Sequence, residues 1–397
     1  MLLIKNCKLI DMNKVYKEKR DILIDGKKIV EIAEEIKAKD DYDIVDAQMK
    51  LVTPGLIESH CHMGVYDTGA ESGIDGNETS DPLLPGLRGL DAINPFDSGF
   101  YAARKHGVTT IVTGPGSANL MGGTFIALKT SDEDLDQRII KEEAALKMAL
   151  GENPKRVYGS KGKSPVTRMG SSALMREEFF KAKAYYEKLK KYEETKDPSD
   201  KPKYDIHLAS LARAFDGMRV KIHAHEADDI ITAIRIAEEF SLNYSIEHTT
   251  SGKMILDYLK DHQVDCIVGP SLGFKTKYEL KHKGAEIGGL MEERGMDFAI
   301  TTDHPVIPIE AMLSQAIFYI KKGASKKKVL QALTINAAKI TDIDERVGSL
   351  EVGKDADLVI WDVPPFDTLY QAGKVFINGK LAYDHKEEGY DFDYKKC

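Results

Sequence analysis

Residues 54–62 read Pro-Gly-Leu-Ile-Glu-Ser-His-Cys-His and place two histidines shortly after the apolar pair Leu56-Ile57. His60 and His62 are two positions apart, so on a β-strand both imidazoles lie on the same face. Two imidazoles on one face can hold a zinc-like ion. A pair of histidines in a loop has the same spacing, so this stretch alone leaves both interpretations open.

Three further apolar runs end in a possible metal ligand. His223 and His225 follow the run 220–222, His248 ends the run 244–248, and Asp303 follows the run 298–300. Asp303 also suits a helix N-cap, because Pro305 could begin a helix. In a parallel barrel the catalytic groups come from the carboxyl ends of several strands. The repeated placement therefore predicts that these side chains meet at one site.

Between residues 53 and 345 short apolar runs alternate with amphipathic segments such as Asp228–Phe240 and Gly252–Asp261. This alternation predicts parallel strands joined by crossover helices. About seven or eight such units suit an α/β fold of the (β/α)8 barrel type. A doubly wound open sheet is the alternative, but no GxGxxG follows any of the runs.

The two ends of the chain differ from the middle. Residues 1–52 and 346–397 contain short alternating strands with hairpin signals at Asp25-Gly26 and Asn378-Gly379. Neither segment has enough strands to be stable alone. We therefore expect both ends to meet in one small β-sandwich domain. Residues 160–205, with a long helix over Met169–Lys191, interrupt the alternation and read as an insertion on the barrel rim.

Composition excludes several classes of protein. The 397 residues contain 56 basic and 64 acidic side chains, a net charge of −8, which disfavours binding to nucleic acid or to anionic membranes. No apolar run approaches the ~20 residues that span a bilayer, and the first residues lack a secretory signal. The four cysteines are scattered without a CxxC pair, which favours a reduced, cytoplasmic protein.

The ordered set PGLIESHCHMG, VKIHAHE, YSIEHTT and AITTDHP resembles the amidohydrolase superfamily of metal-dependent hydrolases, on its imidazolonepropionase, prolidase and deacetylase side. The stretch VGSLEVGKDADLVIWD is similar to the family's return to the small β domain. The resemblance covers essentially the whole chain.

The resemblance implies a divalent metal, with zinc as the first expectation, and one or two ions per chain. It implies metal ligands from four strands and a general base; they are His60, His62, His223, His248 and Asp303, the last also acting as the base. His248 would take part in the chemistry. Glu226 would orient a water or a histidine, and His225 would lie behind the ligands or contact substrate.

One feature departs from the family pattern. Many members carry a carboxylated lysine on the fourth strand, whereas Lys147 lies inside the run 145–150 and not at its end. Glu152, just after that run, resembles the glutamate ligand of some deacetylases. A polar loop residue before a proline turn explains Glu152 equally well, so the number of metals stays open.

The substrate is predicted only by class. The family resemblance implies hydrolysis of an amide or other C–N bond of a small molecule, such as a cyclic amide or an imidazolone. The alternatives are a dipeptidase or N-acyl deacetylase with the same site, or a non-catalytic relative. Arg156 or Arg168 could bind a substrate carboxylate, although a surface salt bridge suits either one. A homo-oligomer would be unsurprising.

Overall fold

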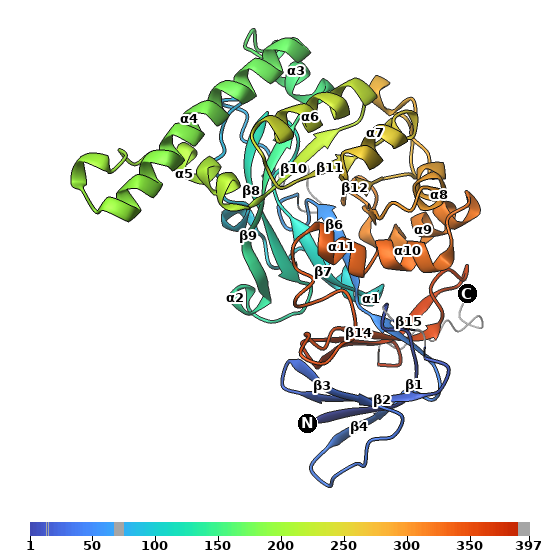
Figure 1. Ribbon diagram of the computed structural model, residues 1–397. Helices are drawn as coiled ribbons and strands as arrows, with labels where there is room; N and C mark the ends of the chain where they lie inside the picture. The colour runs from blue at the N-terminus through green and yellow to red at the C-terminus, as the bar shows by residue number, and fades with distance from the viewer. Residues whose placement is uncertain (13, 15, 67–74, 388–397) are drawn as a thin grey trace.

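The computed structural model describes residues 1–387 except 13, 15 and 67–74. Its strands form two sheets, one in the middle of the chain and one from the two ends (Figure 1). The middle sheet runs in the order β13-β12-β11-β10-β9-β8-β7-β6. Its strands are β6 (Leu56–Cys61), β7 (Val108–Thr113), β8 (Met121–Lys129), β9 (Ile139–Ala149), β10 (Arg219–Ala224), β11 (Tyr244–His248), β12 (Asp265–Val268) and β13 (Ala299–Ile300).

Side chains close this sheet into a barrel. The buried Glu58 of β6 accepts hydrogen bonds from the backbone N–H of Thr302 at 2.8 Å and from its hydroxyl at 2.6 Å, just beyond β13. The first and last strands are thereby joined without a backbone ladder. The predicted eight-stranded α/β barrel is confirmed.

The third strand departs from the ideal (β/α)8 pattern. Strand β8 is antiparallel to both β7 and β9, whereas the other neighbouring pairs are parallel. A parallel connection needs a dozen or more residues, and the segments before and after β8 are too short for a crossover helix; only α2 (Leu135–Arg138) lies between β8 and β9. Gly122 and Gly123 lie inside this buried strand.

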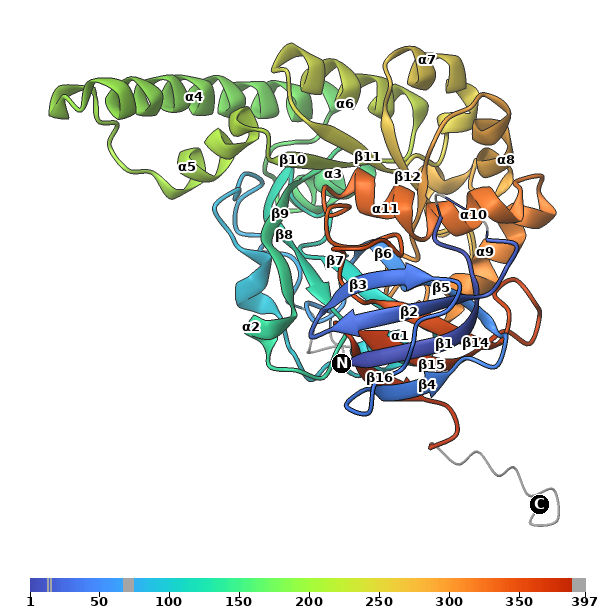
Figure 2. The same cartoon turned by 60° about the horizontal axis from the view of Figure 1, so that its bottom comes forward.

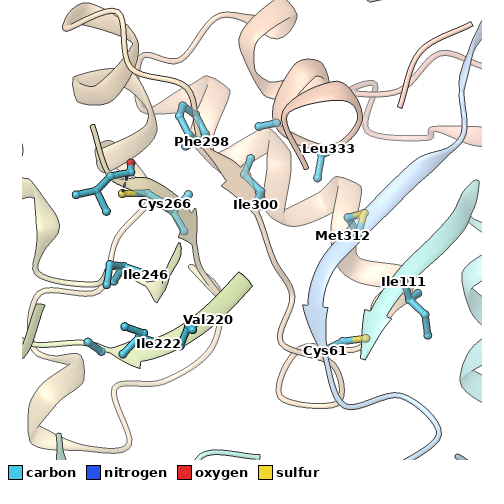
Figure 3. Close-up of a cluster of buried hydrophobic side chains, with 14 of the residues drawn as sticks. Cys61, Ile111, Val220, Ile222, Ile246, Cys266, Phe298, Ile300, Met312 and Leu333 are labelled. Atoms are coloured by element: carbon cyan, nitrogen blue, oxygen red, sulfur yellow. Dashed lines mark hydrogen bonds between the residues drawn. The ribbon is translucent and has the colours of Figure 1, made fainter. Parts of the chain in front are cut away.

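Helices cover the outside of the barrel. They are α1 (Ser98–Lys105), α6 (Ala227–Glu239), α7 (Leu256–Asp261), α8 (Glu286–Glu293), α9 (Met312–Lys321), α10 (Lys326–Ala332) and α11 (Ile335–Ile340). Alternate strand residues such as Ile222, Ile246 and Cys61 share one apolar core with side chains of these helices (Figure 3). Period-two alternation then turns the residues between them toward the barrel interior.

Both chain ends build the second sheet, in the order β16-β15-β14-β5-β1-β2-β3 with β4 beside β1. Its strands are β1 (Leu2–Leu9), β2 (Arg20–Asp25), β3 (Lys28–Ala33), β4 (Asp43–Asp46), β5 (Leu51–Pro54), β14 (Leu358–Val363), β15 (Gln371–Ile377) and β16 (Lys380–Asp384). Residues from both ends, including Ile22, Ile24 and Leu358, share one apolar cluster. Figure 2 shows this sheet lying against the barrel. The domain boundaries at residues 52 and 345 stay a prediction.

The predicted insertion forms an arm. Helix α3 (Glu152–Gly159) is followed by α4 (Arg168–Thr195) and α5 (Ile206–Ala212), and α4 projects away from the barrel (Figures 1 and 2). Short 3-10 turns join the larger elements at Gly89–Ala92, Pro198–Asp200, Arg213–Asp216, Gly252–Met254, Tyr278–Leu280 and Ile309–Ala311. Within the described part of the chain, no helix has the length and apolar character needed to cross a membrane.

The cysteines are part of the core. Cys7, Cys61 and Cys266 are buried and unpaired, and Cys397 lies outside the described residues. Cys61 lies between the two histidines of β6 in sequence, but it packs in the apolar core, as its parity on the strand predicts.

Candidate active site

The barrel brings the predicted strand-end ligands together as two neighbouring groups. His60, His62 and Asp303 have ligand atoms within 4.8 Å of one another, and so do His223, His225 and His248. The groups adjoin, because the ring centroids of His60 and His248 are 5.2 Å apart. Four strands, β6, β10, β11 and β13, supply these six side chains at their carboxyl ends.

Two of the imidazoles have Nδ1 hydrogen-bonded to a backbone carbonyl oxygen. The Nδ1 atoms of His62 and His248 lie 2.8 Å and 2.9 Å from the carbonyl oxygens of Gly114 and Gly269. His60 Nδ1 lies 2.9 Å from the carboxylate of Glu247. A carbonyl oxygen only accepts, so Nδ1 carries a proton in His62 and His248, and in a neutral imidazole the lone pair is then on Nε2. Metal-binding histidines are oriented in this way.

Burial favours the neutral form of four of the histidines. It lowers the pKa of His60, His223 and His225 well below the ordinary value, and it also lowers the pKa of His248. A neutral imidazole is the form that binds a metal. His223 Nε2 is buried and has no hydrogen-bond partner. An unpartnered buried nitrogen in such a donor set fits a cation.

Asp303 lies against the β6 histidines. Its Oδ1 is 3.3 Å from His62 Nε2 and 3.6 Å from His60 Nε2. Burial raises the pKa of Asp303, but His248 and His62 together lower it by a larger amount. The net pKa lies well below the usual range, so the carboxylate is ionised at neutral pH. Asp303 and His248 have φ values of 55° and 72°, a left-handed conformation rarely adopted by such residues and often found at functional sites.

Two buried lysines, which sequence reasoning missed, complete the centre. Lys147 Nζ lies 3.3 Å from His60 Nε2, and burial lowers the pKa of Lys147 to about 8. Lys147 was set aside above for lying inside its run, but β9 runs to Ala149, and Lys147 alternates with the core residues Leu146 and Met148. Its parity therefore turns it inward. A lysine in an apolar run was the available signal, since lysine is almost never fully buried without a partner.

The second lysine acts through a carboxylate. Lys221 Nζ lies 3.0 Å from Glu247 Oε2, the same oxygen that contacts His60, and Ser245 donates to Glu247 Oε1 at 2.6 Å. Burial lowers the pKa of Lys221, and Glu247 opposes that effect. All three side chains are buried. Glu247 thus orients His60 while Lys221 neutralises its charge.

A cavity of about 610 Å³ opens onto these groups, within the usual size range for small-molecule sites. His62, His223, His225 and Asp303 line its inner end. The rest of the described lining combines apolar and polar side chains with three cations, Arg156, Lys277 and Lys283. The cavity can therefore hold an organic molecule against both groups of ligands.

Three predicted site residues lie elsewhere in the structure. Glu152 begins α3, and its backbone N–H donates to Glu279 at 2.9 Å. Glu226 pairs with Lys281 at 2.9 Å, and Arg168 forms a two-point pair with Asp229 at 2.9 Å and 3.1 Å. None of the three belongs to either group of possible ligands or to the lining of this cavity, as far as the described residues go.

Their local surroundings explain these positions. Glu152 lies three residues after the end of β9 and is the first residue of α3. Arg168 pairs with Asp229 of α6 and therefore does not line the cavity. His225 also differs from its prediction. It was expected behind the ligands or at the substrate, but it belongs to the group formed with His223 and His248.

Comparisons with known proteins agree with this architecture. The sequence pattern of the amidohydrolase family matches residues 51–383. An amidohydrolase from Thermotoga maritima has 37% identity and a TM-score of 0.92, covering 97% of this chain and 100% of that one. An imidazolonepropionase of Staphylococcus saprophyticus is 23% identical over 93% of this chain and 91% of its own length.

The amidohydrolase tasK of Hapsidospora irregularis is 25% identical over 92% of this chain, which spans only 40% of that relative. The family pattern covers most of the chain, including all eight barrel strands and both groups of ligands. The chain belongs to the amidohydrolase family and is a hydrolase of that family.

Proposed function

We propose that the chain is a metal-dependent hydrolase that cleaves an amide or other C–N bond of a small molecule. The observation that carries the proposal is the cluster of buried imidazoles beside an ionised carboxylate. In two of them, His62 and His248, a backbone carbonyl holds Nδ1 and leaves Nε2 for a cation. A structural histidine cluster has no need for a buried ring nitrogen without a hydrogen-bond partner, such as His223 Nε2.

The donor set fits divalent cations. His60, His62 and Asp303 would hold one ion, and His223 and His248, with His225 beside them, would hold a second. A bound cation makes its water more acidic and polarises a carbonyl oxygen. Nitrogen and oxygen ligands suit zinc, our first expectation, and also manganese, iron and cobalt.

Lys147 is our candidate for the bridge between the two ions, in place of Glu152. With a pKa of about 8, a fraction of its amine is neutral near pH 7. The neutral Nζ can add to the carbon of CO2, forming an N–C bond and releasing one proton. The carbamate would have two oxygens, and the Nζ atom that would carry it lies 3.3 Å from His60 Nε2.

Asp303 would act as the general base. It is ionised at neutral pH and lies beside the cavity, so it can take a proton from an attacking water. The same carboxyl can then give that proton to the leaving nitrogen. We no longer assign Glu226 a catalytic role or Arg168 a substrate contact.

The test combines metal analysis with a variant of the base. We expect about two cations per chain in protein purified without chelator, and loss of hydrolysis by about 100-fold or more in Asp303→Asn with the fold retained. The substrate panel would contain cyclic amides, imidazolone analogues, dipeptides and N-acyl amino acids. An unimpaired Asp303→Asn enzyme, or a chain that takes up no zinc or manganese, would refute the proposal.

The dipeptidase or deacylase alternative remains a second candidate, favoured by the cations at the cavity mouth. The cytoplasmic location and the possible homo-oligomer stay predictions.

A further inference from the structure

The cavity has a charge opposite to that of the chain. The protein has a net charge of −8, yet the described residues lining the cavity include Arg156, Lys277 and Lys283 and only one carboxylate, Asp303. A cleft lined by one sign of charge attracts ligands of the other sign. If two divalent cations occupy the inner end, the imbalance grows.

Lys277 is held in place at the cavity wall. Its Nζ lies 2.6 Å from Asn153 Oδ1, and the Asn153 amide donates to Ser117 Oγ at 2.8 Å. The Lys277 ammonium also lies 3.7 Å from the carboxylate oxygen Oε1 of the buried Glu279, a distance too long for a good hydrogen bond. An ammonium has three donors, so Lys277 retains donors for a ligand.

Lys283 lies closer to the metal ligands. Its ammonium donates to the carbonyl of Leu272, which leaves two of its three donors. It also lines a small adjoining pocket with His248 and Gly269. Burial lowers the pKa of Lys283, and Asp303 opposes that effect. A half-buried ammonium fixed by a carbonyl is already ordered for an anion, so little entropy is lost on binding.

Part of the remaining wall is apolar and comes from two segments. Leu272 and Phe274 precede Lys277 on the loop after β12, and Val306 and Ile307 follow Asp303. Phe274 is 89% exposed, and Val306 is 59% exposed. These exposed apolar side chains at the cavity rim suit an aliphatic or aromatic group of a ligand.

We propose that the substrate is an amide with a free carboxylate and an apolar side group, such as an N-acyl amino acid or a dipeptide, and that Lys277 and Lys283 select it through that carboxylate. This inference rests on the proposed function for the identity of the bond that is cleaved. It assigns specificity to two lysines of one loop, and not to Arg168. Neutral cyclic amides would be poor substrates.

The experiment compares acids with their amides. The probes are N-acetyl-L-leucine and N-acetyl-L-leucinamide, and L-leucyl-L-phenylalanine and its C-terminal amide. Binding is measured by calorimetry on metal-loaded Asp303→Asn protein, and hydrolysis on the metal-loaded wild type. We expect at least one acid to bind about 10- to 100-fold more tightly than its amide, the range of one hydrogen bond to a charged group.

The variants locate the preference. Lys277→Met and Lys283→Met should each weaken binding of the acid by about 10-fold and leave the weak binding of the amide unchanged. Lys277→Arg should retain part of the preference. Lys275→Met is the matched control, because Lys275 is exposed on the same loop and does not line the cavity. Circular dichroism and the melting temperature check that each variant is folded.

The outcomes separate the two proposals. Equal binding of acids and amides, no binding of either, or an unchanged preference in both methionine variants would overturn the carboxylate inference. Hydrolysis of acid and amide at the same efficiency would overturn it too, while leaving the proposed hydrolase function in place. An acid that binds through the two lysines but is never hydrolysed would support this inference and contradict the proposed function.

Discussion

Glu247→Gln is the substitution that most directly tests how the site is built. Glu247 is buried, and its Oε2 lies 2.9 Å from His60 Nδ1 and 3.0 Å from Lys221 Nζ. Glutamine has the same shape and can place its carbonyl oxygen toward both donors and its amide toward Ser245. The substitution therefore removes the negative charge and little else.

Two effects of different size follow. Residues that orient a metal ligand typically contribute 10- to 100-fold to metal affinity, or about 1.4–2.7 kcal/mol. Removing one partner of a buried ion pair costs about 3–5 kcal/mol of stability. Glu247 opposes the lowering of the Lys221 pKa by burial, so removing its charge should lower that pKa further and offset part of the stability cost.

A second substitution separates the two effects. Adding Lys221→Met to Glu247→Gln removes the unpaired charge, so we expect the free energy of unfolding to recover while metal affinity stays low. Zinc affinity is measured by competition with a chelator, and stability by urea denaturation. Ser245→Ala is the control: it removes one hydrogen bond to Glu247, worth about 1 kcal/mol, and should change zinc affinity only a few-fold. Parental zinc affinity in the folded double variant would refute the reasoning.

Other predictions concern Lys147 and the contact between the two sheets. Lys147→Met should reduce the bound cations from about two to one per chain without unfolding the protein, as elemental analysis would detect; two retained ions would exclude Lys147 as the bridge. Lys129→Met should lower the free energy of unfolding by about 3–5 kcal/mol in urea, because it leaves the buried carboxylates of Asp355 and Asp357 without the lysine that lies 3.0 Å from Asp355. The exposed Lys380→Met, measured in parallel, should change it by about 0.5 kcal/mol or less. Burial raises the pKa of Asp355, but Lys129 and the other cations beside Asp355 lower it by a larger amount, to about 2. Because the folded pKa lies below the unfolded one, this stabilisation of about 2 kcal/mol is complete above about pH 4 and is lost as the pH falls toward 2. Acid titration of Lys129→Met should show a smaller loss, and an identical pH profile would contradict the assignment.

The strand-end ligands could be predicted because strand parity decides where they face. His60, His223 and His248 each end a short apolar run, and parallel strands bring their carboxyl ends to one edge of a barrel. The hairpins at Asp25-Gly26 and Asn378-Gly379 were predictable for a similar local reason, and both are confirmed.

Lys147 and strand β8 could not be predicted with the same rule, because each depends on where a strand begins or ends. Lys147 is recognised as an inward residue only when β9 is known to continue to Ala149. In β8, Gly122 and Gly123 look like turn residues, yet they are buried in the sheet. A Cβ at Gly123 would lie 2.5 Å from the carbonyl oxygen of Leu87, so close packing explains that glycine. That contact involves a segment far away in sequence, which periodicity does not report.

The proposed specificity residues depend on a different kind of information. Lys277 and Lys283 belong to a loop between β12 and α8, where no periodic pattern sets the direction of a side chain. In sequence they are two lysines among many in a chain of net charge −8, and Arg168 looked at least as suitable for a carboxylate. What distinguishes them is their fixed surroundings: Asn153 Oδ1 holds one ammonium and the Leu272 carbonyl holds the other. Arg168 instead has a buried carboxylate of its own. The proposed metal ligands therefore follow from the regular geometry of the strands, whereas the proposed choice of substrate follows from which cations the loops leave without a full partner.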